Sequence, residues 1–238
     1  VKYHPLGVVD YKEAWDFQEL LFQNIITQKQ QGISNPISQL ITCEHPHVYT
    51  LGKSGKKDHL LANDQVLSEI DAKFYQINRG GDITYHGPGQ VVGYPLLDLD
   101  FFFTDIHRYL RLLEETIIQV LASYQILASR SPGETGVWIE PEHLTRARKI
   151  CAFGVRCSRW VTMHGWALNV NTDLNYFNHI IPCGIKGKGV TSMKAELGSS
   201  VNVSEVKERI KTVFAQLFKA ELIYTPLDGL MKVLEPAG

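Results

Sequence analysis

The order of strand-like and helix-like segments constrains the fold of this chain more than any other feature. Apolar residues recur at helical spacing near residues 11–31, 104–124 and 204–217. Short runs rich in β-branched and aromatic residues lie at 38–43, 48–51, 74–78, 91–97, 136–139, 150–157 and 166–170. Because these runs come in groups and do not alternate strictly with helices, we predict an α/β (α+β-like) fold with helices covering a mixed, largely antiparallel sheet.

Length and composition indicate a globular chain. Of its 238 residues, 44% are hydrophobic and 21% are charged, which is typical of a chain that buries a sizeable core. We find no repeat, low-complexity tract or linker. We therefore predict a single domain over 1–238, in which the segment 199–238 could form a small packed lobe.

Charge and hydropathy exclude several protein classes. Lys+Arg of 24 against Asp+Glu of 25 gives a net charge of -1, which provides no broad basic field for nucleic acid. Apolar runs such as 91–97 are far shorter than the roughly 20 residues that cross a bilayer. The first residues, 1–11, show no signal or transit pattern. We expect a cytoplasmic enzyme with no nucleic-acid or membrane partner.

The cysteines do not form a disulfide or metal pattern. They are Cys43, Cys151, Cys157 and Cys183. With no C-x-x-C pair, we predict reduced thiols, and the first three lie on strand-like runs where burial is expected. Only Cys183, between a proline and a glycine, has neighbours that favour access. The histidines of 45–47 lack a second pair at zinc spacing, so we predict a polar strand end or loop and no metal site.

The densest group of chemically versatile residues is the segment 79–90, RGGDITYHGPGQ. Its glycines allow close backbone approach to a ligand, and side chains such as Arg79, Thr84 and His86 can line what approaches. The segment matches neither phosphate-binding glycine pattern, so nucleotide binding is not indicated. The structural alternative is a tight hairpin between a strand ending at 78 and one beginning at 91.

Two later segments predict a strand pair beside a reactive thiol. Lys149 begins an apolar strand that we expect to run into a turn, and the segment 164–171 reads as the returning strand. This pairing would place 165–167 beside 152–154 and form a slot for an extended chain. A lysine at a strand end usually extends to solvent. Because a thiol with a pKa of about 8.5 needs a cation or base to act as a nucleophile, Lys149 is the candidate partner of Cys183.

These motifs together resemble the lipoyl(octanoyl) transferases, the octanoyltransferases of the biotin and lipoate protein ligase superfamily. The resemblance extends from about residue 3 to 220. It rests on 79–90, on Lys149-Ile150 with Ala152 and Gly154, on His164-Gly165 with 167–170, and on Pro182-Cys183-Gly184. Ile181 stands where some members have Asn, and Cys151 where a small residue is usual. Neither departure removes a reactive group.

The resemblance implies a biotin/lipoate protein ligase-like catalytic domain that transfers an octanoyl group. The donor is octanoyl-acyl carrier protein, and the acceptors are lysines in lipoyl domains of 2-oxoacid dehydrogenase acyltransferase subunits and in the glycine cleavage H protein. Cys183 is implied as the acylated nucleophile and Lys149 as its partner, with no cofactor, and we expect a monomer. The implied acyl-substrate contacts are Arg79, Gly80, Gly81, Asp82, Ile83, Thr84, Tyr85, His86, Ala152, Phe153, Gly154, Gly165, Trp166 and Ala167.

The residues leave several roles open. Lys149 can stabilise a thiolate as a cation or accept protons as a neutral amine, and His86 can orient a carbonyl or be structural. We expect Tyr85, Phe153 and Trp166 to be walls of an acyl tunnel, although Tyr85, like Asp82, is more typical of a loop brace. The oxyanion donors are expected at Gly184 and in the turn at 152–154.

Two rival functions remain at this stage. An ATP-dependent lipoate or biotin ligase shares the ancestry, but this chain lacks the G-R-G-R-x-G-R loop. A non-catalytic acyl- or carrier-binding module would keep the fold without the reaction, and the retained Cys183 and Lys149 argue against it. We also expect Arg146, Arg148, Lys186 and Lys188 to meet the acidic surface of a carrier protein.

Overall fold

The computed structural model describes residues 1–34, 36–143, 145–181 and 188–226. In chain order its elements are β1 (Lys2–Val8), α1 (Tyr11–Gln30), β2 (Gln39–Glu44), β3 (Val48–Leu51), the 3-10 helix η1 (Lys57–His59), α2 (Asp64–Glu69), β4 (Lys73–Gln76), β5 (Ile83–His86), β6 (Gln90–Leu96), η2 (Leu99–Phe101), α3 (Ile106–Ala122), β7 (Val137–Ile139), β8 (Arg148–Ser158), β9 (Val161–Asn169), η3 (Leu174–His179), β10 (Gly189–Val190), α4 (Met193–Leu197), α5 (Val203–Phe218) and β11 (Ile223–Tyr224).

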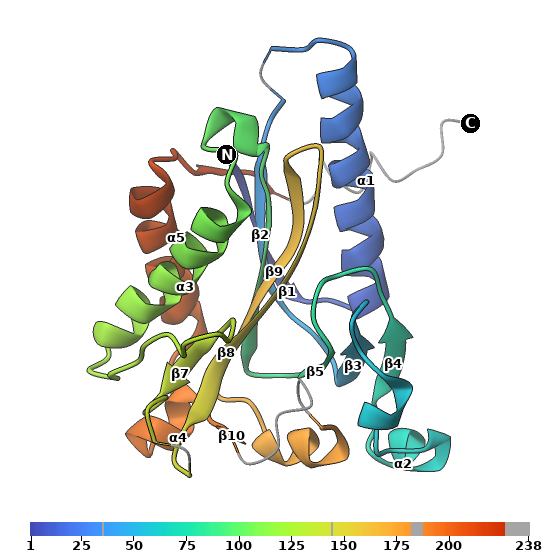
Figure 1. Ribbon diagram of the computed structural model, residues 1–238, viewed down its shortest axis with the longest axis vertical. Helices are drawn as coiled ribbons and strands as arrows, with labels where there is room; N and C mark the ends of the chain where they lie inside the picture. Colours follow the sequence, from blue (N-terminus) through green and yellow to red (C-terminus); the bar gives the residue numbers. More distant parts are fainter. Residues whose placement is uncertain (35, 144, 182–187, 227–238) are drawn as a thin grey trace.

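Two sheets organise the molecule (Figure 1). The larger has the strand order β10-β8-β9-β6-β2-β1-β11, with β7 also paired to β8. Its central strands β2, β6, β9 and β8 run antiparallel, and the parallel pairs lie toward the two edges. The smaller sheet has the order β4-β3-β5. The predicted mixed, largely antiparallel sheet is confirmed.

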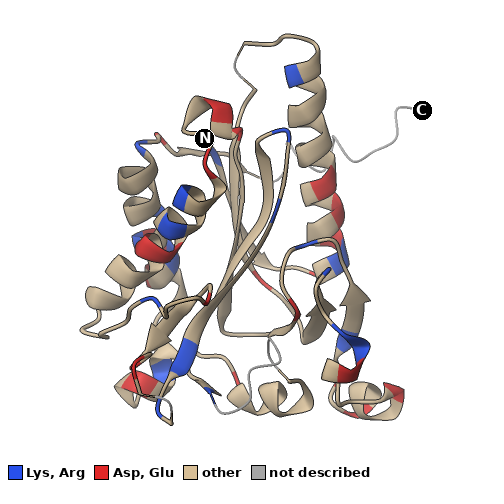
Figure 2. Cartoon of the chain, viewed as in Figure 1, with Lys and Arg blue, Asp and Glu red and all other residues tan. Residues whose placement is uncertain are grey.

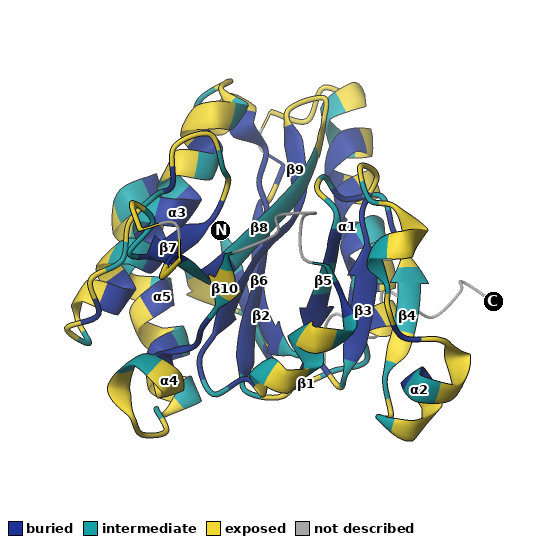
Figure 3. Cartoon of the chain, turned by 60° about the horizontal axis from the view of Figure 1, so that its bottom comes forward, coloured by how far each residue is buried: buried dark blue, intermediate teal, exposed yellow. Residues whose placement is uncertain are grey.

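Helices cover both faces of the large sheet, with α1 on one face and α3 and α5 on the other (Figure 1). Every residue of β6 is buried, because a central strand that is covered on both sides has no solvent face. The same covering explains why the strands are mostly buried and the exposed residues lie largely on helices and loops (Figure 3). Charged residues also lie largely on helices and loops (Figure 2).

The predicted long helices are present, and their ends follow capping chemistry. The Asp10 carboxylate accepts from the backbone N–H of Lys12 at the start of α1, and Asn202 accepts from two N–H groups at the start of α5. The apolar stripe of α3 includes Leu113, Ile117 and Val120, all fully buried. Helical periodicity therefore predicted these elements to within a few residues.

The C-terminal helix α5 packs on α3 within one hydrophobic cluster. Phe214 of α5 and Ile117 of α3 belong to this cluster and are fully buried. The single domain over 1–238 stays a prediction, and its end lies beyond the described residues. Among the helices of the described chain, none is long and apolar enough to cross a membrane.

Two sequence expectations about local structure are wrong. The segment between β4 and β6 contains a further strand, β5, and both β4 and β5 pair with β3, so the alternative of a hairpin from 78 to 91 does not hold. Strand β8 continues through 152–154 to Ser158 without a turn. The reversal instead falls at Arg159 and Trp160, whose positive φ values of 51° and 63° suit a tight hairpin turn.

Burial of the cysteines also differs from the expectation at one position. Cys43 and Cys151 are fully buried, but Cys157 is exposed. The reason is that β8 extends past the core toward its hairpin, so the end of the strand reaches solvent. Cys183 lies outside the described residues, so the expectation for it stays a prediction.

Candidate active site

A cavity of about 420 Å³ lies where the small sheet meets β8 and β9 of the large sheet. This volume is within the range of small-molecule sites. Its lining is mostly apolar and includes Lys149. The other lining residues are Tyr11, residues 79–84, His86, Val92, Tyr94, Leu110, residues 133–135, residues 152–155 and residues 164–167. All predicted substrate contacts except Tyr85 therefore lie around one cavity.

One wall of the cavity is the segment 79–86, which we call the arm. Its first residue, Arg79, is buried and donates from Nη2 to the backbone oxygen of Thr50 at 2.7 Å and to the Thr50 hydroxyl at 2.9 Å. Backbone N–H groups of residues 52–54 donate to backbone oxygens of 79–82 at 3.0–3.2 Å. The arm is thus held by the small sheet and the loop that follows β3.

The arm also docks on the edge of β8. The Gly80 N–H donates to the Val155 carbonyl at 3.0 Å. A Cβ at Gly154 would lie 2.9 Å from the Gly80 carbonyl oxygen and 3.0 Å from Cδ of Arg79. Only a residue without a side chain allows the two backbones to approach this closely.

Asp82 braces the arm from the outside. Its Oδ2 lies 2.5 Å from Nδ1 of His59, and its Oδ1 accepts from the Ile83 N–H at 2.7 Å. The backbone oxygen of His59 in turn accepts from the Ile181 N–H at 2.9 Å. Asp82 is therefore linked through His59 to the last described residue before the segment that carries Cys183.

Tyr85 does not line the cavity. Its hydroxyl bonds Nδ1 of His47 at 2.7 Å, and its ring stacks on Tyr176 with centroids 4.9 Å apart. Side chains alternate along a strand, so Thr84 and His86 project from the face of β5 opposite to Tyr85. These contacts agree with the loop-bracing role and place Tyr85 away from the expected acyl wall.

A chain of hydrogen bonds fixes the proton on His86. The Asn169 amide donates to the Thr191 backbone oxygen at 2.9 Å, which leaves Asn169 Oδ1 to accept from the Gln90 amide at 2.9 Å. Gln90 therefore presents its oxygen to Nδ1 of His86 at 2.8 Å. We assign the proton to Nδ1, so Nε2 carries the lone pair. Burial, reinforced by nearby His45, lowers the pKa of His86 well below its usual value and keeps the ring neutral.

His164 is a cavity residue that was not among the predicted contacts. Its backbone has a positive φ of 61°, its N–H donates to Gln18 at 3.1 Å, and its Nε2 lies 3.0 Å from Asn78 Oδ1. Burial, with Arg79 and Arg156 nearby, lowers the pKa of His164 to about 3. Its position beside Gly165 in a family motif was the sequence feature that could have predicted it as a cavity residue. For Tyr11 and Tyr94, which also line the cavity, the sequence carried no comparable signal.

The second wall is the strand pair β8 and β9. Ala152 faces Ala167, Phe153 faces Trp166, and Gly154 faces Gly165, which confirms the predicted pairing. Trp166 contributes to the lining, and its ring also packs near Phe214 with centroids 6.3 Å apart. Small residues on both strands keep the slot open.

Lys149 lies on β8 at the cavity. Its Nζ is 4.6 Å from the ring centroid of Trp138, and Nζ of Lys188 is 4.9 Å from the same ring. Lys188 forms a 2.6 Å ion pair with Glu134. Although burial opposes ionisation of Glu134, hydrogen bonds from Lys188 and Ser131 leave the pKa of this carboxyl lowered overall.

The basic residues expected to meet an acidic carrier already have carboxylate partners where they are described. Arg148 pairs with Glu140 and Glu196, each at 2.6 Å, and Arg146 pairs with Glu140 at 3.1 Å. Together with the Lys188 pair, these contacts reduce the net positive charge of this surface. Lys186 lies outside the described residues.

The predicted nucleophile also lies outside the described residues, as do Pro182 and Gly184. The described chain ends at Ile181, which is bonded to His59, and resumes at Lys188 and Gly189. The Gly189 N–H donates to the Ala147 oxygen at 2.9 Å, and Val190 pairs with Lys149 in register. Both flanks of the segment are thus anchored beside the cavity.

Metal binding finds no support in the described residues, which contain no group of three or more His, Cys, Asp or Glu side chains that could hold an ion. The charged and titratable side chains of the described lining include Lys149, Arg79, Asp82, Glu134, His86 and His164. The fold and this mostly apolar cavity with a lysine in its wall define a small-molecule-binding domain.

Comparisons with known proteins identify the family to which this domain belongs. The model of the lipoyl protein ligase A/B catalytic domain matches residues 10–215. Octanoyltransferases of Christiangramia forsetii and Flavobacterium psychrophilum are each 57% identical to the chain, covering 94% of it and 98% of their own length. The chain belongs to the lipoyl protein ligase A/B catalytic domain family, and within it to the octanoyltransferases, which are acyltransferases. The predicted family is confirmed.

Solved structures show the same fold at low sequence identity. A bipartite lipoate protein ligase of Thermoplasma acidophilum, studied with its E2 lipoyl domain, has a TM-score of 0.71 at 15% identity, covering 98% of this chain and 91% of its own. A lipoate-protein ligase A bound with ATP has a TM-score of 0.70 at 14% identity, covering 98% and 93%. The predicted ligase-like fold is therefore confirmed.

Proposed function

We propose that the chain moves an octanoyl group from octanoyl-acyl carrier protein to a lysine of a lipoyl domain, through a thioester on Cys183. The observation that carries this proposal is that Lys149 and nearly all predicted acyl contacts line one mostly apolar cavity. An eight-carbon chain at about 0.8 kcal/mol per buried methylene would gain several kcal/mol there. The relatives named octanoyltransferase support the same acyl group.

In the first half-reaction the Cys183 sulfur attacks the carrier thioester carbonyl. A new carbon–sulfur bond forms to Cys183, the bond to the carrier sulfur breaks, and the carrier thiol leaves with a proton. One thioester replaces another, so the step is nearly isoenergetic and needs positioning and an activated thiol more than driving force. Lys149 supplies either a cation beside the thiolate or a proton acceptor.

In the second half-reaction the acceptor lysine amine attacks the Cys183 thioester. An amide forms, the carbon–sulfur bond breaks, and Cys183 recovers its thiol. A free lysine with a pKa of about 10.4 is almost entirely protonated at neutral pH, so a group that removes its proton accelerates the step. Lys149 is the described group suited to this proton transfer, whereas the lowered pKa of His86 makes its Nε2 a weak base that can orient the amine by accepting a hydrogen bond.

Strand geometry supports one backbone N–H as an oxyanion donor. The Val155 carbonyl accepts from the Gly80 N–H, so the backbone N–H and carbonyl of Val155 point away from β9. Because these groups alternate sides along a strand, those of Phe153 also point away from β9. The N–H groups of Ala152 and Gly154 then face β9 and belong to the ladder. We therefore assign the role of oxyanion donor, expected of the 152–154 region, to the Phe153 N–H. Losing such a donor typically costs about 3–4 kcal/mol of transition-state stabilisation.

The proposal includes the acceptor and setting predicted from the resemblance. Lipoyl domains of 2-oxoacid dehydrogenase acyltransferase subunits and the glycine cleavage H protein are the acceptors, with no cofactor. The T. acidophilum ligase studied with its lipoyl domain supports this acceptor class. A monomeric, cytoplasmic enzyme remains the prediction from sequence.

The rival to this proposal is an ATP-dependent ligase, which shares the fold. To distinguish them, intact protein mass is measured after exposure to octanoyl-acyl carrier protein without ATP, and again after a lipoyl domain is added. The variants are Cys183→Ser and, as a matched control, Cys157→Ser, which removes an exposed thiol from β8.

We expect a hydroxylamine-sensitive octanoyl adduct on the wild type and on Cys157→Ser, and its discharge to the lipoyl domain. Cys183→Ser should form no such adduct. Absence of an adduct on every protein while the carrier stays intact would overturn the covalent mechanism. Lipoyl-domain modification that requires ATP would then favour a ligase, and no modification under either condition would favour a binding module.

A further inference from the structure

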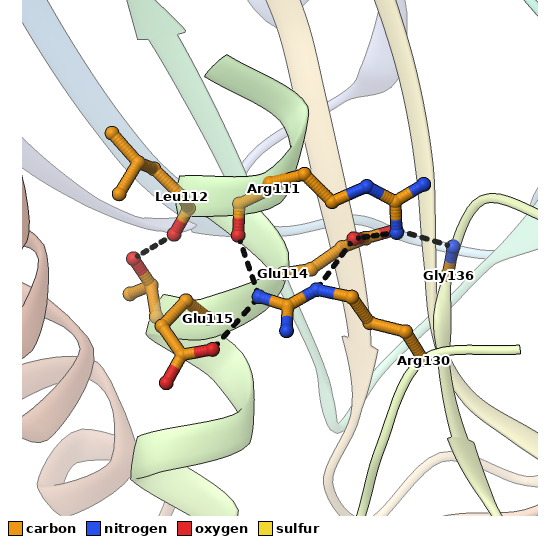
Figure 4. A network of polar contacts seen from close by, with 7 residues as sticks. Arg111, Leu112, Glu114, Glu115, Arg130 and Gly136 are labelled. Atoms are coloured by element: carbon orange, nitrogen blue, oxygen red, sulfur yellow. Dashed lines mark hydrogen bonds and ion pairs between the residues drawn. The ribbon is translucent and has the colours of Figure 1, made fainter. Parts of the chain in front are cut away.

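A fully buried carboxylate lies close to the cavity without lining it. Glu114 of α3 is 0% exposed, and its Oε2 accepts from Nη1 of Arg111 at 2.7 Å and from Nε of Arg130 at 3.1 Å. Its Oε1 accepts from the Gly136 N–H at 3.0 Å. Figure 4 shows how these three donors converge on one side chain. Glu114 thereby ties α3 to both ends of the segment 130–136, which we call the strap.

The strap touches the lysine of the site directly. Gly136 has a φ of +142°, and a Cβ placed on it would lie 3.0 Å from Cε of Lys149 and 3.2 Å from the Cys151 backbone oxygen. The backbone of Gly136 therefore forms a wall against the lysine stem. Any shift of Gly136 must move Lys149 or open a gap beside it.

A second contact ties the strap to the same lysine through Trp138. The Trp138 ring lies beneath Nζ of Lys149 at 4.6 Å, and Lys188 shares that ring while pairing with Glu134 of the strap. A Cβ on Gly136 would also approach Nε1 of Trp138 to 3.1 Å. Gly136 thus lies against both the stem of Lys149 and the ring under its Nζ.

We propose that Glu114 is a positioning residue for the transfer reaction, which holds Lys149 in place through the Gly136 N–H. This inference rests on the proposed function, since it assumes that Lys149 takes part in the chemistry. The carboxylate does not line the cavity, and its described hydrogen bonds go to Arg111, Arg130 and Gly136, so the hydrogen-bonded path from Glu114 toward Lys149 runs through the strap. A displacement of about 1 Å at a reacting group can lower a rate about 100-fold.

The decisive test compares a strap glycine with a glycine away from the cavity. Gly136→Ala inserts a methyl group against Lys149 without touching Glu114. Gly32→Ala is the matched control, because Gly32 also has a positive φ, of 73°, a Cβ there meets nothing within 4 Å, and Gly32 follows α1 and does not line the cavity. Glu114→Gln removes the charge and Glu114→Asp keeps it. We measure kcat and KM for octanoyl transfer, together with thermal unfolding of each variant.

We expect Gly136→Ala to lower kcat by about 10- to 100-fold with KM for the donor changed less than about threefold. Gly32→Ala should stay within about threefold of the wild type in both constants. Glu114→Gln should lower kcat as Gly136→Ala does, and Glu114→Asp should recover part of the loss. If Glu114→Gln does not fold, the partial loss of kcat expected in Glu114→Asp tests the same link.

A spectroscopic readout is independent of activity. Lysines are reductively methylated with a ¹³C label, and the methyl signal of Lys149 is assigned by its loss in Lys149→Met. Because Nζ lies over the Trp138 ring, the ring current should shift this signal, and Trp138→Leu should abolish the shift. Gly136→Ala and Glu114→Gln should change it, whereas Gly32→Ala should not.

Equal losses of kcat in Gly32→Ala and Gly136→Ala would overturn the inference, because backbone strain at a glycine with positive φ would then explain both. Unchanged kcat and an unchanged Lys149 signal in folded Gly136→Ala would overturn it as well. Failure of the wild type to form the octanoyl adduct would instead contradict the proposed function. An altered Lys149 signal without any effect on transfer would show a structural contact that the reaction does not use, and would also overturn the inference.

Discussion

The two walls of the cavity are built by different means. The strand pair β8 and β9 holds its residues by a continuous ladder from Cys151–Leu168 to Ser158–Val161. The arm 79–86 has only its β5 part in a ladder, and its first residues depend on bonds to Thr50 and to residues 52–54. One wall is set by strand pairing, and the other by separate contacts between distant parts of the chain.

The difference divides the chemistry between the walls. The strand wall carries Lys149 and the small residues of the slot, whose places follow from strand register. The arm carries Arg79 and His86, whose hydrogen bonds set their orientation and, for His86, the site of its proton. Substitutions on the strand wall should therefore change the chemical step, and those that separate the walls should change binding.

Replacing Lys149 by Met should give the largest effect. The strand register is unchanged and the lysine stem is largely replaced, so we expect kcat to fall by about 100- to 10,000-fold, the range for a lost acid or base. Thermal unfolding should shift little. The control is Lys56→Met, which removes an exposed lysine near η1. Single-turnover acyl transfer measures both, and retention of more than a third of the wild-type rate by Lys149→Met would assign the chemistry to another group.

Gly154→Ala should separate the two walls. Its Cβ would lie within 3.0 Å of the Gly80 oxygen and the Arg79 side chain, so the arm must move away from β8. We expect KM for the donor to rise about 10-fold and the free energy of unfolding to fall by about 1–3 kcal/mol, a typical cost of overpacking. Gly7→Ala on β1, where a Cβ meets nothing within 4 Å, should change neither. An unaltered KM would show that the arm tolerates displacement.

Acid should destabilise the fold through its buried histidines. Burial lowers the pKa of His164 on the strand wall to about 3 and that of nearby His45 to about 4, whereas the unfolded value is about 6.5. The unfolded state then binds more protons below pH 6.5, so stability is complete above that pH and is lost as the pH falls toward 4. Each ring adds a slope of up to about 1.4 kcal/mol per pH unit.

Urea unfolding between pH 7 and pH 4.5 measures this slope. His164→Asn should reduce it, because asparagine tolerates the positive φ at this position and does not titrate. His107→Asn, which changes an exposed histidine on α3, should leave the slope unaltered. An equal slope in His164→Asn and the wild type would mean that His164 is not buried in a neutral form.

The features that the sequence predicted are those set by local patterns. The stripe through Leu113 and Ile117 predicted α3, and the two segments rich in small residues predicted the register that brings Gly154 opposite Gly165. The arm motif and Lys149 were found because their residue order is specific to a family. The comparisons confirm the family, and the roles of these residues stay predictions.

The misses share a physical cause. The continuity of β8 through 152–154, the exposure of Cys157 and the orientation of Tyr85 away from the cavity all depend on what packs against each segment. Gly154 was expected to lie in a turn, but in the folded protein it lies within β8 and makes room for the arm. No local pattern distinguishes these cases.

By itself, the sequence determined the family, the helices and central strands, and the residue types available for acyl transfer. Only the tertiary structure decided that Arg79 binds Thr50, that Gln90 and Asn169 set the proton on His86, and that Glu114 reaches Gly136 behind Lys149. The reason is that periodicity and motif order act over a few residues, whereas the Arg79–Thr50, Gln90–Asn169 and Glu114–Gly136 bonds join groups 29, 79 and 22 positions apart along the chain. Their geometry is set when the sheets and helices pack around the core.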